Sequence, residues 1–138
     1  MDRPDVNTEP AIPTLFGNRM DVFPNPCPIS VNNSLVCQVL LDQGTDKQKN
    51  NFLKPLARGD KLGAYSLSEP QSGSDASNMK TYAEKNGDHY IINGTKNWVT
   101  SGQNSDFVIF FCLTNKEAGS KGISAFIIEK GTPGLSIG

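Results

Sequence analysis

The fold is decided by residues 81–92, which read TYAEKNGDHYII. The pair Asn86-Gly87 stands here between two short runs, 81–85 and 89–92, that can each form a strand. An Asn-Gly pair favours the positive φ angles of a tight turn between antiparallel strands. The stretch therefore predicts a β-hairpin and places the middle of the chain in a sheet.

Apolar runs on either side of the hairpin extend the predicted sheet. Further strands are expected at residues 62–67, 97–100, 107–114, 123–129 and 135–137. The run 107–114 is almost wholly apolar, as expected of a strand that is covered on both faces. A turn at residues 132–134 (Thr-Pro-Gly) precedes the last strand, which begins just as the chain stops. Because a sheet needs its edges paired or covered, we expect the chain to be part of a longer protein.

Two short helices are predicted before the sheet. The spacing of an amphipathic helix is followed by Leu35, Val36, Val39 and Leu40. We expect Gly44 to end this helix, and Thr45 with Gln48 to form the capping box that opens the second one. Gly59 is expected to close the second helix. This pattern is typical of a helical hairpin.

The chain divides into three predicted parts. Residues 1–28 hold six of the nine prolines and should be extended or disordered, because proline fixes φ and removes a backbone donor. Residues 29–60 form the helical hairpin and residues 61–138 the sheet. The fold class is α+β, a short helical hairpin followed by an incomplete antiparallel β-barrel or sandwich. Its expected core is Leu62, Tyr65, Leu67, Tyr90, Ile92, Trp98, Val108, Phe110, Cys112, Ile123, Phe126 and Ile128.

Composition excludes several classes of function. The formal net charge of −1 gives no electrostatic reason to bind nucleic acid or an anionic membrane. No apolar run is long enough to span a bilayer, and residues 1–10 lack a signal-peptide pattern. The three cysteines, Cys27, Cys37 and Cys112, have no metal-binding spacing, and their odd number suits a reducing compartment. We expect no metal site and no secretion.

The residues that could carry chemistry begin at 65–75, which read YSLSEPQSGSD. A strand delivers Ser68 to its end, and a loop rich in hydroxyl and acidic side chains follows. Free N–H groups and short donors in such a loop suit the oxygens of a ligand. By themselves, however, these residues fit an ordinary polar turn better than a binding loop.

Two longer motifs change this interpretation. Residues 67–76, LSEPQSGSDA, resemble the first signature of the acyl-CoA dehydrogenase family, and residues 90–100, YIINGTKNWVT, resemble its second flavin-facing strand. Shorter matches lie at 31–35, 44–49 and 121–126, and the short- and medium-chain branches are the most similar. The resemblance implies an enzyme that holds FAD and desaturates a fatty acyl-CoA thioester between its α and β carbons.

The resemblance also implies roles for individual residues. The isoalloxazine ring would be lined by Tyr65, Leu67, Ser68, Trp98, Val99 and Thr100. The Ser68 hydroxyl would face the pyrimidine end of the ring, and the Thr100 hydroxyl would lie near flavin N5. Gly73 and Ser74 would contact the acyl-CoA. Fixed donors around the ring stabilise the negative charge that it gains on reduction.

Each role has an alternative. A lone strand tryptophan such as Trp98 is more often a core residue, although the surrounding motif favours flavin contact. Glu69 and Asp75 could form a general acid/base pair, but bracing of the loop is the better interpretation. His89 is expected to be a solvated surface residue.

The chain also departs from the family it resembles. The C-terminal helical bundle that supplies the family's catalytic glutamate is not present in these 138 residues. We therefore assign no catalytic residue and expect the chain alone to be inactive. The alternative is a non-catalytic fragment that binds flavin or acyl-CoA or serves in an interaction. The implied partners of the parent are acyl-CoA, an electron-transfer flavoprotein or similar acceptor, and further copies of itself, in the bacterial cytoplasm or the mitochondrial matrix.

Overall fold

The computed structural model describes residues 30–137. They divide into two compact units between Lys61 and Leu62. The Pro-rich segment 1–28, which contains Cys27, and the final Gly138 lie outside the described residues. Among residues 30–137, no helix combines the length and the hydropathy needed to cross a membrane.

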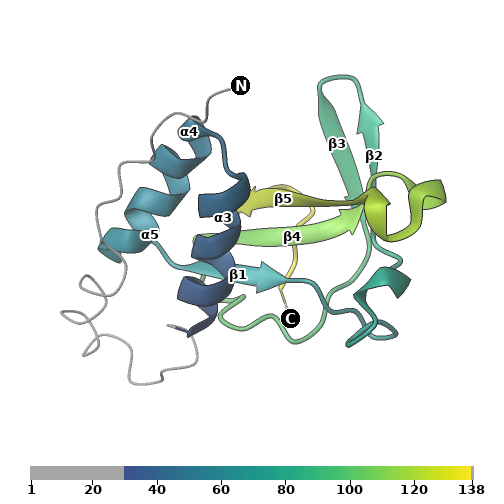
Figure 1. The fold of residues 1–138 in the computed structure, drawn as a ribbon, viewed down its shortest axis with the longest axis horizontal. Helices are drawn as coiled ribbons and strands as arrows, with labels where there is room; N and C mark the ends of the chain where they lie inside the picture. The colour runs from purple at the N-terminus through teal and green to yellow at the C-terminus, as the bar shows by residue number, and fades with distance from the viewer. Residues whose placement is uncertain (1–29, 138) are drawn as a thin grey trace. The chain divides into compact units, whose positions relative to one another are not determined.

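The first unit contains two helical runs. The first run comprises η2 (Asn32–Cys37) and α3 (Gln38–Gln43), and the second comprises α4 (Asp46–Gln48), η3 (Lys49–Leu53) and α5 (Lys54–Arg58). Within this unit, Val36, Cys37, Leu40 and Leu56 are buried. The predicted helical hairpin is confirmed (Figure 1).

Local hydrogen bonds explain where these helices begin and end. The Thr45 N–H donates to Gln48 Oε1 over 2.8 Å, and the Gln48 N–H donates to Thr45 Oγ1 over 3.3 Å, which confirms the predicted capping box. A Cβ atom at Gly44 would overlap the carbonyl oxygen of Leu40, so the first helix ends at a residue that has none. Gly59 ends α5 with a φ of 72°, a left-handed conformation that favours glycine.

The second unit is a five-stranded open sheet. Its strands are β1 (Gly63–Ser66), β2 (Tyr82–Asn86), β3 (His89–Asn93), β4 (Phe107–Leu113) and β5 (Ile123–Glu129). β4 pairs along one side with β5 and along the other with β1, and β2 joins β4 at its end (Figure 1). With the helices of the first unit, this confirms the α+β class.

The strand directions correct the expected antiparallel arrangement. β1 and β2 each pair in parallel with β4, whereas the β2–β3 and β4–β5 pairs are antiparallel. Residues 67–106 connect β1 to β4, and a connection of this length allows a parallel crossover that no hairpin permits. The sheet is therefore mixed.

The central hairpin forms as predicted, but its turn lies one residue later than the predicted Asn86-Gly87 pair. Asn86 pairs with His89, so the two turn residues are Gly87 and Asp88. Gly87 takes the positive φ of 61° that such a turn requires. The strands at 62–67, 107–114 and 123–129 are also confirmed, to within one or two residues at their ends.

Two predicted strands are wrong. Residues 97–100 form no strand because Trp98 has a φ of 59° and Ser101, just beyond them, has a φ of 63°, both in the left-handed region. Residues 135–137 form none either, since the Leu135 N–H is taken by the carbonyl of Thr132 in the predicted turn.

The core of the second unit is centred on β4. Its buried apolar residues are Ala64, Met79, Ala83, Phe107, Val108, Ile109 and Cys112. Two residues of the predicted core are exposed: Tyr90 by 45% and Trp98 by 89%. Tyr90 lies on the outer strand β3, where its ring contacts the Phe126 ring with 5.1 Å between centroids. The other predicted core residues are buried or half-buried.

Candidate functional site

A buried ion pair organises the loop that follows β1. Lys96 Nζ lies 2.8 Å from Glu69 Oε1, and the two side chains are 3% and 2% exposed. The same ammonium group donates to the carbonyl oxygen of Leu67 over 2.9 Å. Lys96 therefore joins the two sequence motifs, 67–76 and 90–100, in the interior of the unit.

The Glu69 carboxylate is a brace for the loop. It accepts the backbone N–H groups of Lys80 and Thr81 over 2.6 and 3.0 Å. Burial raises the pKa of this carboxyl, but the hydrogen bonds from Lys80, Lys96 and Thr81 outweigh burial and lower the pKa to about 2. Glu69 is thus ionised and engaged at neutral pH, which agrees with the bracing role and not with a general acid/base role. Asp75 is exposed and accepts a hydrogen bond from Ser77.

A second contact brings the predicted flavin-facing segments together. The Asn97 N–H donates to the Ser68 carbonyl oxygen over 2.8 Å. Ser68 is thereby held beside the segment that continues into Trp98, 30 positions further along the sequence. The candidate surface, Leu67 and Ser68 of one motif and Trp98 to Thr100 of the other, is therefore joined by a direct backbone contact between Ser68 and Asn97.

This surface carries free hydrogen-bond donors and an aromatic ring. Among the described residues, the N–H groups of Trp98, Val99 and Thr100 have no backbone hydrogen-bond partner. Within the same range, no side-chain hydrogen bond is found for the hydroxyls of Ser68 and Thr100, and both residues are half-buried. With the exposed Trp98 indole, the surface suits a flat aromatic ligand that bears carbonyl oxygens.

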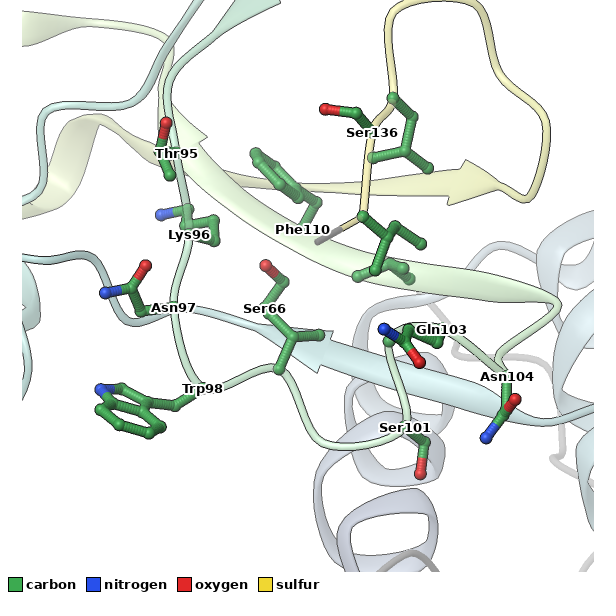
Figure 2. Close-up of a pocket in the computed structure, with 15 residues that line it drawn as sticks. Ser66, Thr95, Lys96, Asn97, Trp98, Ser101, Gln103, Asn104, Phe110 and Ser136 are labelled. Carbon is green, nitrogen blue, oxygen red and sulfur yellow. The ribbon is translucent and has the colours of Figure 1, made fainter.

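A cleft of about 880 Å³ lies beside this surface. Its lining includes Ser66, Lys96, Val108, Phe110 and Ile137. Of the residues proposed from the sequence, Trp98 and Val99 line it, and Figure 2 shows the Trp98 indole directed away from Ser66 and Phe110. The cleft and the Trp98 ring therefore face different directions.

Tyr65 belongs to the other face of the sheet. Successive side chains of a strand alternate between the faces, so Tyr65 points away from the cleft that Ser66 lines. The Tyr65 ring packs on Phe111, with 5.0 Å between the ring centroids. Tyr65, Leu67, Ser68 and Thr100 are not among the residues that line the cleft.

Gly73 and Ser74 lie on an exposed part of the loop. Its base is a reciprocal pair of backbone hydrogen bonds between Glu69 and Ser72, of 2.8 and 3.1 Å. The Ser72 hydroxyl donates to the Asp75 carbonyl over 2.7 Å. Gly73 has no atom within 4 Å of the place where a Cβ would stand, so this part of the loop is open to a ligand.

Lys96 is the residue that sequence reasoning missed. The sequence did contain an indication of its role, because Lys96 is the only acidic residue, lysine or arginine between Asp88 and Asp106. Glu69 is likewise the only such residue between Lys61 and Asp75. An isolated charge in an uncharged stretch is a candidate for a buried pair, but the sequence does not show which two charges meet.

The buried cysteines offer no nucleophile. Cys37 and Cys112 are fully buried, as expected of small core residues, and burial raises the pKa of each thiol to about 11. Among residues 30–137 there is also no group of three side chains that could hold a metal ion.

Known proteins are similar to this chain in sequence. Residues 64–138 match the sequence model of the acyl-CoA dehydrogenase middle domain. A short-chain-specific acyl-CoA dehydrogenase of Clostridium acetobutylicum is 47% identical over 110 residues, which are 80% of this chain and 29% of that protein. The mitochondrial short-chain-specific acyl-CoA dehydrogenase of Rattus norvegicus is 42% identical over 110 residues, 80% of this chain and 27% of that protein. The chain thus spans less than a third of the length of these curated relatives.

Solved structures share the fold as well. Butyryl-CoA dehydrogenase from Megasphaera elsdenii is similar with a TM-score of 0.77 and 45% identity, covering 80% of this chain and 29% of that one. A structure described under the electron transferring flavoprotein of Acidaminococcus fermentans gives a TM-score of 0.79 and 44% identity, covering 81% and 30%. Sequence and fold agree, and the chain belongs to the acyl-CoA dehydrogenase family.

Proposed function

We propose that this chain supplies the flavin-facing surface of an FAD-dependent acyl-CoA dehydrogenase that desaturates a fatty acyl-CoA thioester between its α and β carbons. One observation carries the proposal. The segments 67–68 and 96–97 are joined by hydrogen bonds, which supports a common surface for Ser68, Trp98 and Thr100. The short-chain specificity of the named relatives supports a short acyl chain.

The hydrogen-bond donors of this surface support the proposed flavin contact. When bound, FAD would accept the hydride that leaves the β carbon of the substrate. Ser68 would offer its hydroxyl to the pyrimidine end of the ring, and Thr100 would offer its hydroxyl near N5. The N–H groups of residues 98–100, which have no backbone partner in the described part of the chain, would add donors that need no reorganisation. Such fixed donors favour the accumulation of negative charge. Trp98 would lie against the ring, with Val99, Leu67 and Tyr65 completing the contact.

Substrate contact is assigned to the exposed loop. Gly73 and Ser74 would touch the acyl-CoA, and the open space around Gly73 allows a close approach to the backbone. The base of this loop is held by Glu69, whose ion pair and N–H contacts keep it in one conformation.

Glu69 is not available as a base for α-proton removal. Glu69 directly follows Ser68 in the sequence, and its buried carboxylate is paired with Lys96 and has a pKa of about 2. Loss of a positioned general base typically lowers the rate by a factor of about 10² to 10⁴. We therefore expect no useful turnover by the isolated chain, and measurable oxidation of butyryl-CoA with an electron-acceptor dye would contradict this.

We also propose an electron acceptor, an oligomeric state and a location for the parent, the longer enzyme to which this chain would belong. Its electron acceptor would be an electron-transfer flavoprotein or a similar carrier, and the parent would form a homo-oligomer. Named relatives occur in a bacterium and in mitochondria, which supports the bacterial cytoplasm or the mitochondrial matrix as the location.

A second candidate is a non-catalytic fragment that binds flavin or acyl-CoA or serves in an interaction. The donor-bearing surface around Trp98 favours it, because binding requires these groups and not a base. The two candidates differ in turnover once the remaining helical part of a full-length relative is joined to residues 30–138. Turnover by that chimera would support the enzyme, whereas flavin binding without turnover would support the fragment.

The first test is a titration of the purified chain with FAD, followed by flavin fluorescence quenching. We expect saturable binding that is weakened by Trp98→Ala and by Ser68→Ala. Tyr90→Ala is the matched control, because it removes another exposed aromatic side chain that lies on β3. Binding that all three variants retain equally would place the flavin elsewhere.

A further inference from the structure

Lys96 is a buried cation two positions before Trp98. Its ammonium group donates to Glu69 and to the Leu67 carbonyl oxygen, and it lies 5.5 Å from the centre of the Phe110 ring. A charge with 3% exposure is tolerated only where hydrogen bonds and an opposite charge replace water. The position of Lys96 relative to Leu67 and Glu69 is therefore closely determined.

The Glu69 carboxylate, which pairs with Lys96, also binds a third stretch of the chain at residues 80–81. Glu69 also accepts the N–H groups of Lys80 and Thr81, so the charges join residues 67–69, 80–81 and 96. One position after Lys96, the Asn97 N–H donates to Ser68. Beyond Asn97, the N–H groups of residues 98–100 have no backbone partner among the described residues. The segment is thus anchored before Trp98 by Lys96 and Asn97, and its next backbone hydrogen bond is from the Gly102 N–H to the Val99 carbonyl over 3.1 Å.

The conformation of Trp98 needs such an anchor. A φ of 59° is strained for a large side chain, and strained residues persist only where their surroundings determine them. The Trp98 side chain is 89% exposed, so its own packing does little to hold this conformation. The nearest fixed points on the N-terminal side are the hydrogen bonds of Asn97 and Lys96.

We propose that Lys96 and Glu69 are a positioning pair that holds residues 96–100 against residues 67–69. They set the spacing between Trp98 and Ser68 on the flavin-facing surface without touching the flavin. The identity of the ligand rests on the proposed function, whereas the positioning is a property of the chain itself. Lys96 acts through the backbone of its own segment.

The test uses the single tryptophan of the chain as its probe. Lys96→Met keeps the length of the side chain but removes its charge and donors. We expect time-resolved fluorescence anisotropy to show nanosecond motion of Trp98 with a larger amplitude in this variant. We also expect its Kd for FAD to rise about tenfold or more, because small displacements of positioning groups have large effects. Lys96→Arg, which keeps the charge and the donors, should retain most of both properties.

A core variant separates positioning from general stability. Phe107 is buried at the start of β4, where it pairs with Gly63, whereas Lys96 lies over the ring of Phe110. Phe107→Leu therefore removes packing from the core without changing a residue that contacts Lys96. It should destabilise the chain while leaving Trp98 anisotropy and the Kd for FAD unchanged. The inference is overturned if folded Lys96→Met behaves like the unmodified chain, or if Phe107→Leu changes both readouts as much as Lys96→Met does.

Two further outcomes are also decisive. If Lys96→Met does not fold, the double variant Glu69→Gln/Lys96→Met removes both charges and takes its place. Restricted motion of Trp98 in that folded variant would overturn the inference, and increased motion would support it. If the unmodified chain binds no FAD, the proposed flavin contact fails for this chain, and the anisotropy of Trp98 still decides whether the pair positions the segment.

Discussion

Gly94 packs so closely against Thr81 that a Cβ atom at Gly94 would stand 2.6 Å from the Thr81 Cβ. The two residues lie on either side of the β2–β3 hairpin, and Thr81 donates its N–H to the Glu69 carboxylate. Gly94 also has a φ of 152°, a conformation that residues with side chains rarely adopt. The approach of these two backbones therefore depends on glycine.

Gly94→Ala should lower the free energy of unfolding by about 3 kcal/mol or more, because it adds a steric overlap to backbone strain. Gly87→Ala is the matched control. Gly87 also has a positive φ, 61°, but no atom within 4 Å of a Cβ, so about 1 kcal/mol is expected. Urea unfolding of both variants measures the difference. Equal losses would show that the contact with Thr81 contributes nothing.

The stability of the chain should fall in acid because of Glu69. Its folded-state pKa is about 2, below the ordinary 4.5, so its contribution is fully present above pH 4.5 and is lost as the pH falls towards 2. A difference of this size corresponds to about 3 kcal/mol. Urea midpoints at pH 7 and pH 2.5 should show a smaller acid-induced loss in Glu69→Gln than in the unmodified chain. An identical loss in both would mean that Glu69 is not the group responsible.

Trp98→Gly should stabilise the chain relative to Trp98→Ala by about 1 kcal/mol, since glycine adopts a φ of 59° without strain. The unmodified side chain is exposed, so its removal takes little packing away. Both variants should bind FAD more weakly than the unmodified chain. Thermal unfolding and FAD titration of the same samples measure the two effects. A glycine variant less stable than the alanine variant would contradict the assignment of strain to Trp98.

The buried thiols should resist modification in the folded chain. Burial raises the pKa of Cys37 and Cys112 to about 11, so at pH 8 only about one thiol in a thousand is ionised. In a Cys27→Ser background, a thiol reagent at pH 8 should label both residues slowly in the native chain and rapidly in guanidinium chloride. Rapid labelling of the native chain would show that this interior opens readily.

Much of the local structure could be predicted from the sequence. The capping box of Thr45 and Gln48 and the stop at Gly59 involve residues within a few positions of each other, where spacing alone specifies the hydrogen bonds. The hairpin turn near Gly87 is local in the same way, and it was displaced by only one residue. The run 107–114 was apolar enough to identify the central strand.

By itself, the sequence determined the helical hairpin, the five strands that form in their order along the chain, and the two motifs that resemble the family. Only the tertiary structure decided that β1 and β2 run parallel to β4, that Trp98 is exposed and that Lys96 meets Glu69. The physical reason is distance along the chain. Lys96 and Glu69 are 27 positions apart, and a pair at such a separation is selected by the burial of both charges together, which no periodicity of either segment encodes.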